Sequence, residues 1–106
     1  MQIIVNSENF EQEITKSTQP VVLDVFASWC GPCLQMAPIF EELAKEMSEK
    51  YKFAKLNIDE ERDLAIQYNV SSIPTFIFIK NGEVVGRELG YMDKETLKSK
   101  IEGIFE

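Results

Sequence analysis

Residues 21–33 read VVLDVFASWCGPC. The first part of this stretch, residues 21–27, is almost continuously apolar and rich in β-branched side chains, which is typical of a strand buried on both faces. Cys30 and Cys33 are the only cysteines of the chain, and apolar side chains follow them at helical spacing. A buried strand that leads directly into a helix predicts an α/β fold with helical crossovers between parallel strands.

After residue 33 the chain continues to alternate helices and strands, until two expected strands follow one another directly. Asn81-Gly82 is expected to join two strands in a tight antiparallel hairpin, because both residues tolerate a positive φ. The sequence therefore predicts a mixed central sheet with helices on both faces. The expected strands are residues 3–5, 21–27, 52–58, 75–80 and 83–89, and the expected helices follow Asn6 or Ser7, cover 33–49 and 60–69, and follow a capping Asp93.

Length and charge narrow the range of functions. The 106 residues fit one domain, 1–106, with a continuous core. A net charge of -7 with no basic run disfavours nucleic acid or an anionic membrane as a partner. The chain has no histidine, which excludes a Cys-His hydrolase. No apolar run approaches the roughly 20 residues that span a bilayer, and we expect a monomer because nothing indicates an obligate dimer.

The first residues indicate a cellular compartment. Residues 1–6 contain neither a basic segment nor a long apolar run, so no secretory signal is visible. We therefore expect a reducing cytoplasm. In that compartment a lone CxxC motif is more often catalytic or metal-binding than a structural disulfide.

The spacing of Cys30 and Cys33 suits thiol–disulfide exchange. Two thiols three residues apart can close a small disulfide ring and open it again, and a helix N-terminus beside them favours the thiolate form. One alternative is a permanent disulfide. The other is half of a zinc site, which would need two chains because zinc takes about four ligands and the chain has no other cysteine or histidine. Exchange chemistry is the favoured interpretation, and we expect no bound metal.

Asp24 interrupts the apolar run of residues 21–27. If the strand is buried on both faces, burial raises the pKa of this carboxyl group and lets it exchange a proton near neutral pH. The alternatives are a solvated aspartate on an edge strand and a buried one that is merely hydrogen-bonded. The residues alone leave this choice open.

The chain resembles the thioredoxin family along nearly its whole length. A lone CxxC motif is weak evidence, but here the landmarks of the family occur in the family's order. They are Asp24 six residues before Cys30, the Trp29-Cys30-Gly31-Pro32-Cys33 core, Ala37-Pro38, Lys55-Leu56-Asn57-Ile58-Asp59, Ile73-Pro74-Thr75, Lys80-Asn81-Gly82 and Gly90.

The resemblance implies a fold and roles for individual residues. The fold is a mixed sheet flanked by four helices, with the CxxC motif at the end of the second strand. Cys30 would attack a substrate disulfide and Cys33 would resolve the mixed disulfide. Asp24 would lie beneath Cys33 and assist proton transfer, with Lys55 nearby tuning its charge.

The resemblance also implies a docking rim for an extended substrate segment. In this family the Ile73–Pro74 bond is cis and faces the cysteines, and Ile73 would offer its backbone to the substrate. Each residue of the rim, taken alone, is more often part of a core or a turn. The implied rim consists of Trp29, Gly31, Pro32, Ile58, Ile73, Pro74 and Gly90.

By the same resemblance the chain is a general protein-disulfide reductase. Gly31-Pro32 between the cysteines is typical of reductants in this family, whereas oxidases and isomerases usually carry other residues there. No cofactor would be bound, and a flavin-dependent thioredoxin reductase would recycle the protein with NADPH. A narrower oxidase or isomerase, and a binding subunit that does not need its thiols, are the rival functions.

Two positions depart from the common family pattern. Leu34 and Ser71 stand where basic residues are frequent, so positive charge is missing near the cysteines. We expect acidic partners to dock less well as a result.

Overall fold

The computed structural model describes residues 2–106, so Met1 of the expected 1–106 domain lies outside the described residues. Within these residues the strands form one mixed sheet in the order β1-β3-β2-β4-β5. β1, β3 and β2 run parallel, whereas β4 runs antiparallel to both β2 and β5. The strands are β1 (Gln2–Ile4), β2 (Val21–Phe26), β3 (Lys52–Asn57), β4 (Thr75–Lys80) and β5 (Glu83–Leu89).

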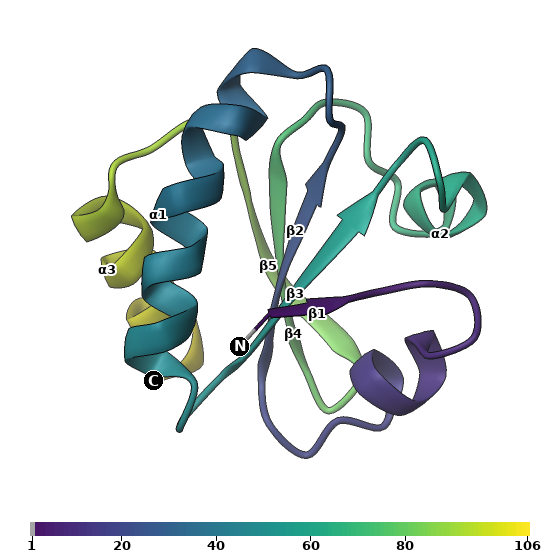
Figure 1. The fold of residues 1–106 in the computed structure, drawn as a ribbon. Helices are drawn as coiled ribbons and strands as arrows, with labels where there is room; N and C mark the ends of the chain where they lie inside the picture. The colour runs from purple at the N-terminus through teal and green to yellow at the C-terminus, as the bar shows by residue number, and fades with distance from the viewer. Residues whose placement is uncertain (1) are drawn as a thin grey trace.

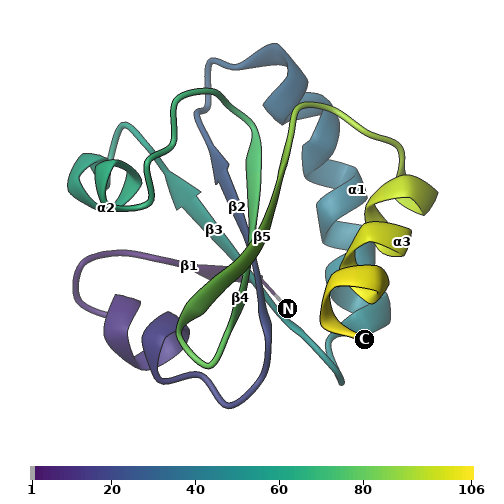
Figure 2. The ribbon, with the colours of Figure 1, turned by 180° about the vertical axis from the view of Figure 1, so that it is seen from behind.

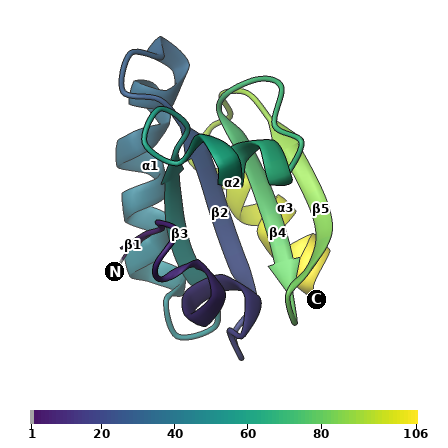
Figure 3. The same ribbon diagram turned by 90° about the vertical axis from the view of Figure 1, so that its right-hand side faces the viewer.

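Helices cover both faces of this sheet. α1 and α3 lie together on one face, and η1 and α2 lie on the other (Figure 1), an arrangement that is also clear from behind (Figure 2). Figure 3 views the molecule from the η1 and α2 side and shows β3, β2, β4 and β5 next to one another. The helices are η1 (Glu11–Thr15), α1 (Gly31–Met47), α2 (Arg62–Gln67) and α3 (Lys94–Phe105). The predicted mixed α/β fold is confirmed, although the first of its four helical segments is a short π-helix.

The two faces of the sheet bury two separate apolar cores. Because side chains alternate along a strand, Val22 packs toward α1 and α3, whereas Leu23 packs toward η1 and α2. On the α1 side, the Phe40 ring meets the Phe53 ring edge to face, with centroids 5.3 Å apart. β2 is therefore apolar on both faces, as predicted, and Asp24 is the exception on the α1 face.

The helix ends follow from local hydrogen bonds. The Asn6 side chain accepts hydrogen bonds from the N–H groups of Glu8 and Asn9, which holds a turn and delays the start of the first helix. Asp93 caps α3 as predicted, because its Oδ1 accepts a hydrogen bond from the N–H of Thr96 at 2.9 Å.

α1 begins at Gly31, two residues earlier than the sequence predicts. Pro32 suits the first turn of a helix, where its missing N–H would have no partner in the helix. Cys30 is the N-cap residue, with extended backbone angles of φ -86° and ψ 116°. Both cysteines are thereby fixed at one end of the longest helix of the described chain.

Candidate functional site

The two cysteines lie where β2 ends and α1 begins. Cys30 and Cys33 form a disulfide, with their Cα atoms 5.2 Å apart. The Cys33 N–H donates a hydrogen bond to Cys30 Sγ at 3.2 Å. In this oxidised state both side chains are buried, with 6% of Cys30 and 4% of Cys33 exposed. The pair is thus close enough to open and close without moving the backbone far.

The N-terminus of α1 favours negative charge on the sulfur of Cys30. The first N–H groups of a helix have no partner within the helix, and its dipole places partial positive charge there. Residues 31–34 carry no acidic side chain that would oppose a thiolate. When the disulfide is open, the N–H of Cys33 is in place to stabilise a Cys30 thiolate.

The segment around Ile73 lies directly against the disulfide. The carbonyl oxygen of Ile73 is 3.9 Å from Cys30 Sγ. The Ile73–Pro74 peptide bond is cis, which confirms the prediction made from the family resemblance. The carbonyl of Pro74 accepts a hydrogen bond from the N–H of Gly90 at 2.9 Å. Two parts of the expected docking rim that are distant in sequence are therefore neighbours.

The structure brings the remaining rim residues to the same end of the sheet. Ile58 and Ile73 pack against the buried cluster that Ala27, Cys30 and Cys33 form. Together with Trp29 they also line a groove of about 440 Å³. Gly31 precedes Pro32 at the start of α1, and a Cβ atom added at Gly31 would meet nothing within 4 Å. This glycine leaves open space beside the disulfide.

Gly90 has a backbone conformation that favours glycine. Its φ is +87°, in the left-handed region that other residues rarely adopt. A Cβ atom there would also meet nothing within 4 Å, so the surface beside Pro74 is open. Position 90 in the turn after β5 therefore favours glycine because of its backbone angles, and not because a larger side chain would clash with a neighbour.

Asp24 is buried in the middle of the sheet. Only 2% of it is exposed, and its Oδ1 has no hydrogen-bond partner among residues 2–106. Burial raises the pKa of Asp24 to about 7, against an opposing effect of the Lys55 charge. Of the alternatives that the sequence left open, the structure supports the buried carboxyl group with a raised pKa. Asp24 lies on the α1 face of β2, one pleat below Phe26, which packs against the buried cluster of Ala27, Cys30 and Cys33.

Lys55 stands next to Asp24 in the sheet. The two residues are paired in register between β2 and β3. Lys55 Nζ lies 4.5 Å from the centroid of the Phe26 ring. The lysine also lines a second cavity, of about 380 Å³, between β1, β3 and α1. The structure thus places Lys55 between the buried carboxyl group and a cavity at the edge of the sheet.

One contact at the site was not predicted. Trp29 Nε1 donates a hydrogen bond to Asp59 Oδ2 at 2.8 Å, which ties the rim to the loop after β3. The sequence does single out Asp59, because it is the last residue of the family landmark that begins at Lys55. The partner could not be read from the pattern, since the two residues are 30 positions apart.

The described residues show neither a metal cluster nor a membrane-spanning helix. In residues 2–106 no three His, Cys, Asp or Glu side chains gather as a metal site would require. None of the described helices is long and apolar enough to cross a membrane.

Comparison with known proteins places the chain in a family. The thioredoxin family model matches residues 1–103. The chain belongs to the thioredoxin family. It is 41% identical over 97 residues to a thioredoxin from Haemophilus influenzae, covering 92% of this chain and 91% of that protein. It is 43% identical over 95 residues to a thioredoxin from Chlorobaculum thiosulfatiphilum, covering 90% of this chain and 88% of that protein.

Some thioredoxin relatives are longer than this chain. The chloroplastic M-type thioredoxin of Pisum sativum is 44% identical over 99 residues, and the chain spans 58% of its length. The corresponding protein of Spinacia oleracea is 46% identical over 98 residues, and the chain spans 54% of its length. The thioredoxin likeness therefore extends over most of this chain but over little more than half of these two relatives.

Proposed function

We propose that the chain is a general protein-disulfide reductase that works by dithiol–disulfide exchange. The observation that carries this proposal is the Cys30–Cys33 disulfide at the N-terminus of α1, with the Cys33 N–H directed at Cys30 Sγ. Thiol–disulfide oxidoreductase activity is the chemistry of the thioredoxin family, to which the chain belongs. The exchange needs no bound cofactor, since the electrons are carried by the dithiol itself.

In the proposed cycle, the reduced protein transfers two electrons to its client. The Cys30 thiolate attacks one sulfur of the client disulfide, a mixed disulfide forms, and the first client thiolate leaves. The Cys33 thiolate then attacks Cys30 Sγ, which releases the second client thiolate and closes the Cys30–Cys33 disulfide. The client gains two electrons and two protons, and the protein loses the same number.

Asp24 accepts the proton of Cys33 in the resolving step of this proposal. A carboxyl group with a pKa of about 7 exchanges protons readily at neutral pH. Its place one pleat below Phe26, which packs against the cluster of Ala27, Cys30 and Cys33, supports a short route for the proton. Lys55, paired with Asp24 in the sheet, tunes the charge of that carboxyl group.

The client docks on the rim around the disulfide in this proposal. An extended client segment would pair with the backbone at Ile73 and pass close to Cys30. The approach of the Ile73 carbonyl to Cys30 Sγ, at 3.9 Å, supports this path. Trp29 and Ile58 line the groove and supply apolar contact, while Gly31 and Gly90 leave the path open.

The proposal includes a partner and a compartment. A thioredoxin reductase that uses NADPH would return the oxidised pair to the dithiol, and the protein would act as a monomer in the cytoplasm. A catalytic cysteine pair with no other cysteine in the chain is typical of a reducing compartment.

Reduction of insulin disulfides tests the proposed activity. We expect the intact chain to accelerate insulin reduction by dithiothreitol, and by NADPH when a thioredoxin reductase is supplied. A chain that accelerates neither reaction is not a reductase. If the chain works with dithiothreitol but not with thioredoxin reductase and NADPH, the result counts only against the proposed partner. Dithiothreitol tests the chain by itself.

The reduction potential of the pair distinguishes a reductase from an oxidase or isomerase. Known family values are about -270 mV for thioredoxins and about -180 mV for protein disulfide isomerase. We expect equilibration with a glutathione redox buffer to place the Cys30–Cys33 pair near the first value. A potential near the second value would contradict the direction of transfer proposed here.

A further inference from the structure

A polar pocket lies between the segment that follows α2 and the strands β4 and β5. Its volume is about 310 Å³, at the small end of the range for ligand sites in proteins (about 300–1,000 Å³). Among the described residues that line it none is acidic, whereas Asp59 lines the groove beside the disulfide and Glu41 lines the cavity at Lys55. We call it the Arg87 pocket, and its lining residues are Asn69, Val70, Ser71, Thr75, Arg87 and Leu89.

Arg87 is a half-buried cation without a carboxylate partner. Within residues 2–106, Lys55 and Arg87 are the half-buried basic side chains that make no ion pair, and Lys55 stands next to Asp24 in the sheet. Partial burial of a charge costs free energy unless an opposite charge compensates it. A guanidinium group in this position therefore favours an external anion. The half-buried basic side chains that do pair with a glutamate are Lys52, Lys94, Lys98 and Lys100.

The fold holds the Arg87 side chain on the η1 and α2 side of the sheet. Arg87 pairs in register with Ile77, which belongs to the core on that side. Arg87 Nη2 donates a hydrogen bond to the carbonyl oxygen of Tyr68, where α2 ends. The next residue, Glu88, pairs in register with Phe76 of the other core and forms an ion pair with Lys100 at 3.4 Å. This glutamate therefore does not neutralise Arg87.

The donor groups of the pocket match a phosphate group better than a carboxylate. The planar guanidinium offers parallel N–H groups that suit two oxygens of one anion. Asn69 adds an amide and Ser71 a hydroxyl, from a segment that faces β5 across the pocket. The Thr75 hydroxyl already donates to the carbonyl oxygen of Ser72, at 2.6 Å. A phosphate group has one more acceptor oxygen than a carboxylate and a larger negative charge, so it can use all three remaining donor side chains.

We propose that the Arg87 pocket binds a phosphate group, either as free inorganic phosphate or on a phosphorylated side chain of a protein. The site does not depend on the proposed reductase function. It adjoins the segment proposed for client docking, because Val70 and Ser71 line both this pocket and the groove beside the disulfide. Ser71 stands where the family often has a basic residue, and Arg87 places a positive charge in the same pocket.

Titration with inorganic phosphate, followed by ¹⁵N NMR, tests the site. Sodium phosphate is added at about pH 7.5, where it is largely dianionic, and sodium chloride and sodium acetate are matched titrants at the same ionic strength. We expect phosphate to shift the Arg87 Nε–H signal and the backbone signals of Asn69 and Ser71 in one saturable transition. Equal shifts with chloride or acetate, or no saturation below about 0.1 M phosphate, would overturn the proposal.

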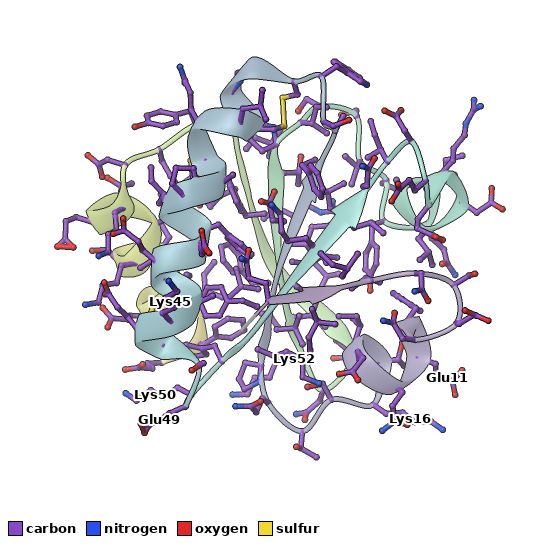
Figure 4. All side chains as sticks on the ribbon, viewed as in Figure 1. Glu11, Lys16, Lys45, Glu49, Lys50 and Lys52 are labelled. Carbon is purple, nitrogen blue, oxygen red and sulfur yellow. A yellow bond between two sulfur atoms is a disulfide. The ribbon has the colours of Figure 1, made fainter. Side chains whose placement is uncertain are left out.

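Substitutions of Arg87 test its role. Arg87→Gln should weaken phosphate binding at least about tenfold, and Arg87→Lys, which keeps the charge but not the parallel donors, should have a smaller effect. Lys45→Gln is the control and should bind normally, because this exposed lysine projects from α1, on the other face of the sheet (Figure 4). If Arg87→Gln does not fold, Arg87→Lys is compared with Lys45→Gln. Equal affinity in the folded Arg87 variant and the control would overturn the site.

Peptides without cysteine identify the source of the phosphate group. A phosphoserine peptide that binds at least about tenfold more tightly than inorganic phosphate would support a phosphorylated protein segment as the ligand. Equal affinity would support free phosphate. The unphosphorylated serine peptide should leave the Arg87 signal unchanged, and an equal shift with it would mean that the pocket does not select phosphate. None of these measurements involves the cysteines, so they stand whether or not the chain proves to be a reductase.

Discussion

Replacing Cys33 by serine is expected to turn the reduced protein into a covalent trap for its clients. Cys30 keeps its place at the N-terminus of α1 and can still attack a disulfide. The resolving thiol is gone, so the mixed disulfide can be released only by an external thiol. Intramolecular groups in good geometry act as if present at about 10⁵ M or more, whereas added thiols are millimolar. We therefore expect turnover to fall by at least about 10³-fold.

Intact-mass spectrometry measures the trapped species. The reduced Cys33→Ser protein, mixed with a cystine peptide, should gain the mass of one peptide half and lose it when dithiothreitol is added. Cys30→Ser is the matched control, since it also retains a single thiol. The hydrogen bond from the Cys33 N–H points to Cys30 Sγ, so only Cys30 is set up as the attacking sulfur. Equal adduct formation by the two variants would contradict the assigned roles.

Local signals in the sequence were sufficient to predict the hairpin of β4 and β5. β4 and β5 span residues 75–80 and 83–89 as predicted, because apolar side chains and an Asn-Gly turn specify a hairpin within a short stretch. Asn81 and Gly82 both have a positive φ.

α2 is shorter than predicted at both ends. Its last turn closes at Asn69, whose left-handed φ of 57° ends the helix at a point that apolar spacing cannot reveal.

Contacts between distant segments explain what the sequence could not predict at the site. The cysteine pair was identified from its spacing, and the cis bond at Pro74 only from the family resemblance. The hydrogen bond between Trp29 and Asp59 joins the end of β2 to the end of β3, so it depends on how α1 returns the chain to the sheet. The apolar run of residues 21–27 predicted burial on both faces, but it could not show that α1 is the element that covers the Asp24 side.

Retention of Asp24 in a buried site has a cost in stability. Its side chain is 2% exposed and its Oδ1 lacks a partner among residues 2–106, so ionisation is opposed by burial. A carboxyl group with its pKa moved from 3.8 to about 7 is costly above neutral pH. A residue that weakens the fold while suiting proton transfer is typical of a functional site. This contrast supports the proposed role of Asp24 and leads to a prediction that does not depend on activity.

Asp24→Asn is expected to stabilise the oxidised protein, and the gain should grow with pH. The folded state holds the Asp24 proton up to a pKa of about 7, whereas the unfolded chain releases it near 3.8. The raised pKa favours the folded state fully below pH 3.8, and this contribution is lost as pH rises through 7. Asparagine has no proton to lose, so its advantage is near zero at about pH 4 and about 4 kcal/mol at about pH 9.

Urea unfolding of both oxidised proteins at several pH values measures this difference. The same substitution at the exposed Asp63 should change the free energy of unfolding little at any of them. A gain for Asp24→Asn that is equal at pH 4 and pH 9 would mean that packing, and not ionisation, limits stability at this site. In the reductase assay the variant should resolve mixed disulfides more slowly, and the rate should lose its rise through pH 7, because asparagine cannot accept the Cys33 proton. Stability and activity would then change in opposite directions through one carboxyl group.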